Sequence, residues 1–360
     1  MKIVHVVEST ATGTLSVVCM ISNRLANEGH EVYVVFSRRS ETPDNLASLF
    51  HPNVQLRQFQ MKGRSVARIL FGLRRELENL RPDIVHLHSS FAGFLGRLST
   101  ISCLKSAKFF YSPHCISFMR SDVSWLKKTG FIGLEALACL RRCTYVACSE
   151  SERAIVKRYL RTQVVLVENA LDKHVATDHP VALTRARARP ATCVVTVGGI
   201  RRQKNPELFA EIARLFNRQG VEFVWIGDGD EASKKVLCEA NVTVTGWLSR
   251  SVAMEMVKRA DVYLSTSSWE GMPISIIEAM ALGTPVIASG CPGNVDVLRH
   301  AQTGMIFNSA KEAVASLTRM TGDEDFRIAI AQSAHDEVCK RFSEDRFFDD
   351  VTALYETQMT

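Results

Sequence analysis

Short apolar runs alternate with amphipathic stretches along almost the whole chain, and this alternation limits the fold more than any other feature. Residues 3–7, 32–36 and 84–88 are typical of buried strands, and the segments between them have helical periodicity. Strands separated by helices form parallel sheets, because a parallel connection has to cross the sheet. The sequence therefore predicts a doubly wound α/β fold.

The alternation is interrupted once. Between residues 171 and 192 the pattern loosens around Pro180 and Pro190, and it restarts with a strand at residues 193–197. A chain of 360 residues is long enough for two domains. We therefore expect one domain at residues 1–172, a second at 173–340, and a last helical segment at 341–360.

Composition places the chain among ordinary globular proteins. Hydrophobic residues make up 46% and charged residues 23% of the sequence, as in an average soluble domain. No apolar run is long enough to span a membrane, and the N-terminus enters a strand without a signal-peptide pattern. The expected location is the cytoplasm.

The ten cysteines show no CxxC spacing, which disfavours zinc and favours buried, reduced thiols. A net charge of +6 is compatible with anionic partners, but no nucleic-acid-binding motif is present.

Basic residues collect in two stretches of the first half, beside apolar helical faces. They are Lys62, Arg64, Arg68, Arg74 and Arg75, and then Lys127, Lys128, Arg141 and Arg142. Two solvated helix faces would explain this pattern. Peripheral contact with an anionic membrane is the alternative that it leaves open.

Two glutamates separated by seven residues follow the apolar run at residues 261–264. Pro273 suits the first turn of a helix, which does not need its N–H group. Glu270 is therefore expected in the loop and Glu278 within the helix. We expect the free N–H groups of residues 274–276 to face an anion, and the carboxylates to bind sugar or ribose hydroxyls. Ordinary cap and surface residues are the alternative.

A glycine-rich basic loop joins the strand at residues 193–197 to the next helix. Gly198 and Gly199 permit a tight turn and the close approach of a ligand. Positive side chains follow directly, namely Arg201, Arg202 and Lys204. Such charge near a helix start suits a diphosphate, although a plain turn with solvated side chains has the same pattern.

Two further strands end in glycine-containing turns. Gly227 is followed by Asp228 and Asp230 in the sequence Gly-Asp-Gly-Asp, and Gly246 precedes Trp247. The two aspartates resemble a metal-binding pair, but glycine and aspartate also favour turns by themselves. Backbone groups beside Gly246 suit a planar base, and a packed tryptophan at a strand end is the simpler explanation.

Together these motifs resemble the retaining glycosyltransferases of the GT-B fold, specifically family 4. The most specific element is the glutamate motif, in the context Ser-x-Trp-Glu-Gly-Met-Pro-x-Ser-x-x-Glu-Ala-Met-Ala-x-Gly-Thr-Pro-Val-Ile-Ala. Supporting elements are Gly13 and residues 86–90, 112–114, 148–152, 167–172, 198–205, 227–229, 245–247 and 303–304.

The resemblance covers nearly the whole chain and implies two Rossmann-like, doubly wound domains that face each other across a cleft. Residues 1–172 would bind the acceptor and residues 173–340 the nucleotide sugar. The helix within 341–360 would cross back to the first domain.

The resemblance implies four catalytic residues. His114 would face the reacting sugar, and Glu270 would contact the hydroxyls of that sugar. Lys204 and Arg202 would neutralise the departing diphosphate. The configuration of the sugar would be retained, and neither a metal ion nor a cofactor would be needed.

The other implied residues bind the donor. Glu278 would hold the ribose, and Gly13 with Thr14 would approach the phosphate or the acceptor. The remaining donor-binding residues are Gly199, Arg201, Gly227, Gly246, Trp247, Gly271, Met272, Pro273, Ile274 and Ser275.

The chain departs from the family pattern at three places. Gly199 stands where the family often has arginine, so that Arg201 or Arg202 would supply the charge. The first loop keeps only Gly13 of a glycine pair, and Cys115 replaces a frequent glycine.

The predicted function is sugar transfer from a UDP- or GDP-sugar to a saccharide or polyprenol-linked saccharide. The product would be a surface polysaccharide such as O-antigen, capsule or exopolysaccharide, made at the inner face of the plasma membrane. A UDP-sugar 2-epimerase of the same fold and a noncatalytic nucleotide-sugar-binding protein are the alternatives. A nicotinamide enzyme is disfavoured, because no Gly-x-Gly-x-x-Gly motif follows a predicted strand.

Overall fold

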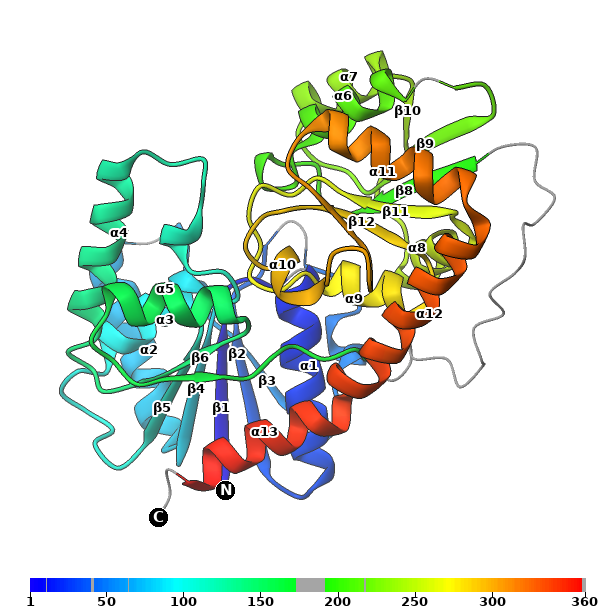
Figure 1. Ribbon diagram of the computed structural model, residues 1–360. Helices are drawn as coiled ribbons and strands as arrows, with labels where there is room; N and C mark the ends of the chain where they lie inside the picture. Colours follow the sequence, from blue (N-terminus) through cyan, green and yellow to red (C-terminus); the bar gives the residue numbers. More distant parts are fainter. Residues whose placement is uncertain (11, 40–41, 64, 173–191, 217, 358–360) are drawn as a thin grey trace. The chain divides into compact units, whose positions relative to one another are not determined.

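The chain forms two α/β units (Figure 1). The computed structural model describes residues 1–357 except for 11, 40–41, 64, 173–191 and 217. Unit 1 comprises Met1–Ala170 together with Glu344–Thr360, and unit 2 comprises Leu171–Ser343. Most of the segment that we interpret as a linker lies outside the described residues.

Unit 1 contains a seven-stranded parallel sheet in the order β3-β2-β1-β4-β5-β6-β7. Its strands are β1 (Lys2–Val7), β2 (Glu31–Phe36), β3 (Gln55–Gln58), β4 (Ile84–His88), β5 (Lys108–Ser112), β6 (Thr144–Ala147) and β7 (Val164–Leu166). The strand order reverses between β1 and β4, where His5 pairs with His86 and Val7 with His88. Ligands of doubly wound sheets bind at the carboxyl ends of the strands beside such a reversal.

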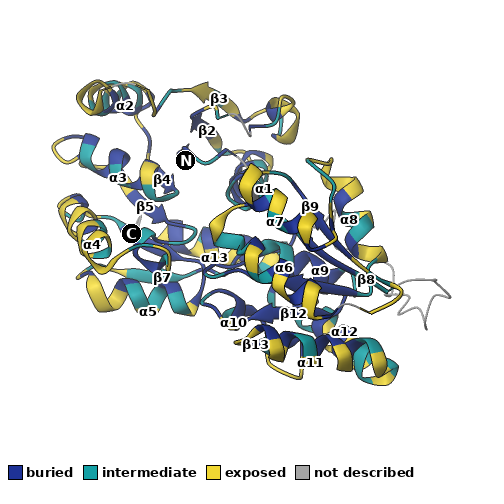
Figure 2. Cartoon of the chain, turned by 90° about the horizontal axis from the view of Figure 1, so that it is seen from above, coloured by how far each residue is buried: buried dark blue, intermediate teal, exposed yellow. Residues whose placement is uncertain are grey.

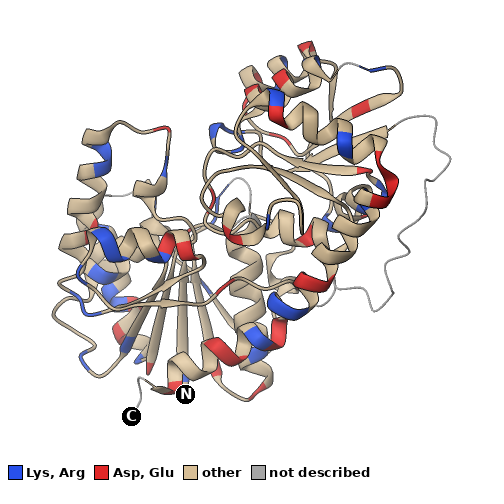
Figure 3. Ribbon diagram, viewed as in Figure 1, with Lys and Arg blue, Asp and Glu red and all other residues tan. Residues whose placement is uncertain are grey.

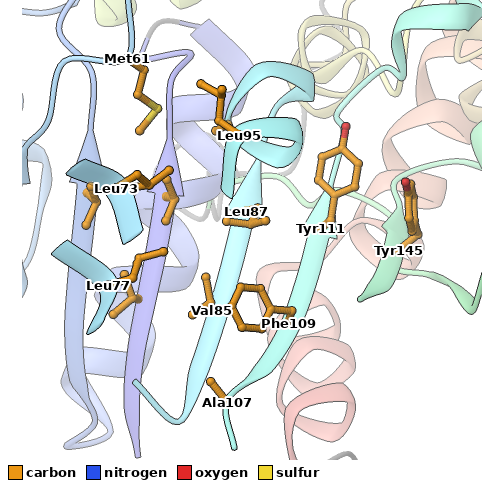
Figure 4. Packing of buried hydrophobic residues seen from close by; sticks show 14 of the residues in the cluster. Met61, Leu73, Leu77, Val85, Leu87, Leu95, Ala107, Phe109, Tyr111 and Tyr145 are labelled. Carbon is orange, nitrogen blue, oxygen red and sulfur yellow. The ribbon is translucent and has the colours of Figure 1, made fainter. Parts of the chain in front are cut away.

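Helices cover both faces of this sheet. They are α1 (Thr12–Asn27), α2 (Val66–Leu80), α3 (Ser90–Ser99), α4 (Trp125–Ala138), α5 (Glu150–Tyr159) and α13 (Glu344–Thr357), with short 3-10 turns η1 (Leu46–Leu49) and η2 (Ser117–Met119). Leucines of α2 and α3 pack on Val85, Leu87 and Phe109 of one face (Figure 4). The opposite face receives α13, where the Tyr355 ring lies 4.9 Å from that of Phe110.

Unit 2 contains a six-stranded parallel sheet in the order β10-β9-β8-β11-β12-β13, which reverses between β8 and β11. Its strands are β8 (Thr192–Val197), β9 (Val221–Ile226), β10 (Val242–Val244), β11 (Val262–Ser265), β12 (Val286–Ser289) and β13 (Met305–Phe307). Its helices are η3 (Arg202–Lys204), α6 (Pro206–Leu215), α7 (Glu231–Glu239), α8 (Arg250–Arg259), α9 (Ile274–Ala281), α10 (Asn294–Val297), α11 (Ala310–Gly322) and α12 (Glu324–Arg341). The central strands are buried between these helices (Figure 2).

The expected strands and helices are found, with shifted ends. The clearest difference is α4: the sequence pattern predicts a helix over about residues 130–141, whereas the helix begins at Trp125 and ends at Ala138. Ser124, in an extended conformation, precedes its first turn. Gly130 and Gly133 lie inside this helix, although glycine costs about 1 kcal/mol relative to alanine there. Tertiary contacts of α4 therefore outweigh the local preference.

A buried ion pair fixes α4 to α3. The Arg97 guanidinium donates from Nη2 to Oε2 of Glu135 over 2.5 Å, and the Arg97 side chain has no exposed surface. The hydroxyls of Tyr145 and Tyr111 donate to the same carboxylate at 2.7 and 3.2 Å. The Arg97, Glu135, Tyr111 and Tyr145 side chains thus provide one another with hydrogen-bond partners inside the core.

No helix within the described ranges combines the length and the hydrophobicity that a membrane-spanning segment needs.

Replacement of Glu135 by alanine is expected to lower the free energy of unfolding of unit 1 by about 3–5 kcal/mol, because Arg97 stays buried without its partner. Urea unfolding measures the loss. Glu78→Ala is the matched control, since it removes the exposed Arg74–Glu78 pair at 3.0 Å and should cost at most about 0.5 kcal/mol. Equal losses in the two variants would contradict a structural role for the buried pair.

Candidate active site

The loops after β8 and β9 touch through their main chains. A Cβ atom on Gly227 would lie 2.2 Å from the Gly198 carbonyl oxygen, and one on Gly229 would lie 2.2 Å from that of Ile200. The φ angle of Gly227 is 145°, which side-chain-bearing residues rarely adopt. Only glycine fits at these positions. At the carboxyl edge of the sheet, the two loops therefore pack on each other through main-chain atoms without side chains between them.

The loop after β10 joins this edge. Gly246 bridges to Gly227, and a Cβ atom on Gly199 would lie 3.5 Å from the Trp247 ring. The Trp247 side chain is 58% exposed, so its indole offers a flat apolar surface beside bare backbone. The structure therefore brings together four residues that the sequence analysis selected from three separate loops.

Asp228 and Asp230 are both used in local structure. Lys234 Nζ lies 2.8 Å from Oδ1 of Asp228, and its hydrogen bond lowers the pKa of that carboxyl. Asp230 caps α7 by accepting from the N–H group of Ser233 at 2.9 Å, which lowers its pKa as well. These contacts explain the Asp-Gly-Asp sequence without a metal ion.

A buried ion pair lies at the reversal between β8 and β11. Lys204 Nζ is 2.9 Å from Oε1 of Glu270, and both side chains are largely buried. Burial by itself lowers the pKa of Lys204, but the Glu270 carboxylate outweighs it, and the net pKa is raised. Lys204 is therefore charged at neutral pH, in a place where a full charge is poorly screened.

Two further side chains bind the Glu270 carboxylate, and the sequence analysis identified neither of them. The Ser267 hydroxyl donates to Oε1 at 2.8 Å, and the Gln203 amide donates to Oε2 at 3.0 Å. The backbone is fixed too, since the Glu270 N–H group donates to the Pro292 carbonyl at 3.1 Å. Gly293 lies so close that a Cβ atom there would be 2.7 Å from Glu270.

Glu278 lies on α9 and is also paired. Arg250 donates from Nη2 to Oε1 of Glu278 at 2.7 Å and from Nη1 to Asp172 at 2.8 Å. Burial raises the pKa of Glu278, and the Arg250 charge opposes that rise. The sequence analysis identified Glu278 but missed Arg250.

The start of α9 differs in detail from the expectation. Pro273 is the residue before the helix, and Gly271, Met272 and Pro273 are buried. The N–H groups of Ile276 and Ile277 both donate to the Pro273 carbonyl, at 3.1 and 3.3 Å. The expectation that residues 274–276 all offer free N–H groups is therefore wrong for Ile276, because the first turn closes on Pro273.

The remaining selected residues of unit 2 lie at the surface of this edge. Ile274 and Ser275 are half-buried, whereas Arg201 and Arg202 are exposed. The charge of Arg202 contributes to the lowered pKa of Asp230. Among the described residues, neither arginine forms an ion pair like that of Lys204 with Glu270.

In unit 1, Gly13 and Thr14 do not lie in a loop. Helix α1 begins at Thr12, so both residues belong to its first turn. The sequence pattern predicts a helix only from about residue 15, since glycine and threonine are weak helix formers. The first turn tolerates such residues because its N–H groups need no helical partner.

The loop after β5 holds His114 in a strained conformation. His114 has a φ of 56° and Cys115 a φ of 117°. The fully buried Glu152 carboxylate accepts from the N–H groups of Cys115 and Ile116, each at 2.9 Å, and of Cys148 at 3.0 Å. Glu152 thus stabilises a backbone that glycine would adopt more easily, and this explains how Cys115 is accommodated.

Four histidines cluster behind this loop. His5, His86 and His88 are buried, and His114 is half-buried. Burial lowers the pKa of His5 to about 3 and of His114 to about 4, and it holds the pKa of the other two well below the usual range. All four imidazoles are neutral at physiological pH.

Three of these histidines, His5, His86 and His88, have ligating nitrogens within 4.8 Å of one another. The sequence analysis did not foresee a group with this spacing. Nδ1 of His86 is already 2.6 Å from the Tyr355 hydroxyl, and its Nε2 is 2.8 Å from the Ser112 hydroxyl. A divalent ion would displace one of these bonds and bury its charge among neutral rings, so the group fits a metal poorly.

Two family models match the chain. Residues 187–336 match glycosyl transferases group 1, and residues 11–175 match Glycosyltransferase Family 4. The chain belongs to the group 1, family 4 glycosyltransferases. It is an enzyme of the transferase class. This favours sugar transfer over the epimerase and the noncatalytic binding protein that the sequence analysis considered.

Relatives of this glycosyltransferase span most of its length. Amylovoran biosynthesis glycosyltransferase AmsD of Erwinia amylovora is 26% identical over 351 residues, 91% of either chain. The UDP-Gal:alpha-D-GlcNAc-diphosphoundecaprenol alpha-1,3-galactosyltransferase of Escherichia coli is 25% identical over 312 residues, 79% of this chain and 78% of the relative.

Solved structures confirm the predicted GT-B fold. Anabaena HepE, in complex with UDP and glucose, matches with a TM-score of 0.82 at 14% identity, over 99% of this chain and 100% of HepE.

The glycosyltransferase is expected to lose stability as the pH falls below about 6.5, the pKa of histidine in an unfolded chain. The unfolded chain then takes up protons that the buried imidazoles, with pKa values lowered to about 3 for His5 and about 4 for His114, do not accept. The free energy of unfolding therefore decreases toward acid, by up to about 1.4 kcal/mol per pH unit for each such histidine.

Urea midpoints measured from about pH 8 to about pH 5 test this expectation. His5→Phe should flatten the pH dependence, whereas His300→Gln, at an exposed position, should leave it as in the wild type. An unchanged slope in His5→Phe would contradict the assignment.

Proposed function

We propose that this enzyme transfers a sugar from a UDP-sugar to a lipid-linked saccharide, with retention of configuration, in the synthesis of a surface polysaccharide. The observation that carries the proposal is the buried Lys204–Glu270 pair at 2.9 Å, beside the glycine loops at the strand ends. A charged lysine and a fixed carboxylate there suit the two ends of a glycosyl phosphate.

The lysine acts on the leaving group. Cleavage of the glycosyl–phosphate bond develops negative charge on the diphosphate, and a fixed cation stabilises that charge. Lys204 keeps its proton, because Glu270 raises its pKa. The exposed side chains of Arg201 and Arg202 add further positive charge, and we assign the diphosphate contact to Arg202 first, as the resemblance implies.

The carboxylates position the donor. Glu270, held by Ser267 and Gln203, accepts hydrogen bonds from the sugar hydroxyls. Glu278 accepts from the ribose, with Arg250 on its Oε1 atom as a fixed neighbour. The backbone of residues 271–275 contacts the sugar and the phosphate.

The base and the acceptor end complete the assignment. The exposed Trp247 ring and the backbone of Gly199, Gly227 and Gly246 form the surface for the base. In unit 1 we assign His114 to the reacting sugar, and Gly13 with Thr14 to the phosphate or the acceptor.

The relatives support the chemical class of both substrates. The name of the E. coli relative specifies UDP-Gal and a diphosphoundecaprenol-linked acceptor, and that of the Erwinia relative specifies amylovoran biosynthesis. HepE was solved with UDP and glucose. These names favour a UDP-sugar over a GDP-sugar and a lipid-linked acceptor over a free saccharide.

The test is the release of UDP or GDP from a panel of nucleotide sugars, with polyprenyl-diphosphate saccharides as acceptors. Lys204→Met should lower kcat about 100-fold while the donor KM changes little, by analogy with the loss of one oxyanion-stabilising group. Lys258→Met, which removes an exposed lysine of α8, is the control and should keep full activity. A Lys204→Met enzyme with the kcat of the wild type would contradict the assignment of Lys204 to the leaving group.

A UDP-sugar 2-epimerase is distinguished by its lack of an acceptor. NMR of UDP-GlcNAc incubated with the protein alone would show the 2-epimer if the protein were an epimerase. We expect no epimer.

Unit 1 carries the membrane contact in this proposal, at the cytoplasmic face of the plasma membrane. On α4, Trp125 and Leu126 are 72% and 63% exposed, next to the exposed Lys127. On α2, Phe71 is 71% exposed, and Arg75, four residues further on, is exposed as well. Figure 3 marks the lysines and arginines of these helices in blue. Basic and apolar side chains on one helix favour the interface of an anionic bilayer.

Arg141 does not belong to this basic surface, although the sequence analysis included it. It is buried and donates to the carbonyls of Thr100, Cys103 and Leu104 at 2.7–3.0 Å, and so it serves the core of unit 1. Arg64 lies outside the described residues.

The double variant Trp125→Glu, Leu126→Glu should abolish co-flotation with vesicles that contain phosphatidylglycerol, because it replaces apolar contact with charge repulsion. Leu215→Glu, at a 53% exposed position of unit 2, is the matched control and should still float. Equal flotation of both variants would remove α4 from the proposal.

A further inference from the structure

A chain of imidazoles runs from the interior of unit 1 to His114. Nδ1 of His5 is 3.0 Å from Nε2 of His88, and Nδ1 of His88 is 3.1 Å from Nε2 of His114. The His88 and His114 rings are stacked, with centroids 5.4 Å apart and planes inclined by 12°. The chain links strand β1, strand β4 and the loop after β5, which no short segment of sequence would connect.

The three tautomers in this chain are coupled. A neutral imidazole has one N–H group and one lone pair, so a ring that accepts at one nitrogen must donate at the other. If His5 donates to His88, then His88 donates to His114, and the reverse order holds throughout if the first bond is reversed. The lowered pKa values exclude the doubly protonated ring that would break this rule.

The environment of His5, at the buried end of the histidine chain, determines in which direction the hydrogen bonds run. Nε2 of His5 has no hydrogen-bond partner among the described residues. If the chain ran inward from His114, this nitrogen would carry a buried N–H group without an acceptor. If it runs outward, the nitrogen carries only an unused lone pair. Buried N–H groups without acceptors are rarer in proteins than underused acceptors.

We propose that His88 is a positioning residue that, together with His5, fixes His114 with its proton on Nδ1, so that His114 presents an N–H donor to the substrate. That His114 contacts the substrate rests on the proposed function; the orientation of the ring rests on unit 1 alone. Oxygen atoms of a sugar or a phosphate accept such a hydrogen bond.

The chain is not a path for net proton transfer. It ends at Nε2 of His5, which is buried and has no described partner, so a proton that entered at His114 would not leave. The second pair of bonds, from His86 to Tyr355 and Ser112, occupies both nitrogens of His86 and leaves none for the chain. The role of the chain is to set geometry and tautomer.

Nitrogen-15 NMR of histidine-labelled full-length protein tests the tautomers without any substrate. We expect His5, His88 and His114 all to carry the proton on Nδ1, with each signal assigned by the loss of one resonance set in His5→Phe, His88→Asn or His114→Asn. The opposite tautomer at the three positions, or different tautomers among them, overturns the proposal.

Two variants of His88 separate its two bonds. An asparagine amide lies near the Nδ1 position of histidine and a glutamine amide near the Nε2 position. His88→Asn therefore keeps the contact with His114 and loses that with His5, and His88→Gln does the reverse. Because each variant removes one buried hydrogen bond, their melting temperatures should fall by similar amounts.

The kinetic consequence differs between them. With the UDP-sugar that the wild type uses, His88→Gln should lower kcat about 10- to 100-fold at an unchanged donor KM, by analogy with the loss of the hydrogen-bond partner of a metal-ligating histidine. His88→Asn should retain more of kcat than His88→Gln does. The reverse ranking, or equal values, overturns the positioning role.

The outcomes for the proposed function are distinct. Full activity in His114→Ala would remove His114 from the substrate contact, while the NMR spectra of the wild type would still decide the tautomers. If the protein turns over no nucleotide sugar, the proposed function is refuted. The NMR spectra of the wild type would still decide whether His5, His88 and His114 have the proposed tautomers.

Discussion

Desolvation is the constraint on which the carboxyl edges of both sheets depend. Lys204, Glu270, Glu278 and Glu152 are largely buried, and each binds a partner that another segment supplies. An unpaired charge at such depth costs several kcal/mol, whereas a satisfied one specifies a geometry more than it adds stability. We regard these contacts as the reason that the loops after β5, β6, β8, β10 and β11 each keep one arrangement. The protein itself therefore supplies a partner to each of the side chains that we assign to donor binding.

The sequence predicted what depends on neighbouring residues. Strand and helix alternation, the restart of the pattern in the second half and the glutamate motif all lie within short segments. The structure confirms the α/β class and places Gly199, Gly227, Gly246 and Trp247 together, because parallel strands end at one edge. Errors concern the ends of helices, where weak helix formers such as Gly13 hide the first turn.

Partners distant in the chain were missed. Arg250 lies 28 residues before Glu278, Gln203 lies 67 residues before Glu270, and His5 lies 83 residues before His88. Such pairs follow from strand order and register, which local patterns do not contain. One signal was available: histidines two residues apart in a strand share a face, so His86 and His88 were predictable neighbours.

Helix α13 has a consequence for synthesis of the chain. It belongs to unit 1, and the Tyr355 hydroxyl lies 2.6 Å from His86 in the middle of the sheet. Every residue of unit 2 is therefore translated before unit 1 receives its last helix. On the ribosome, the second unit therefore has its complete sequence first, while the part of the first sheet around His86 and Phe110 waits for α13 to be made.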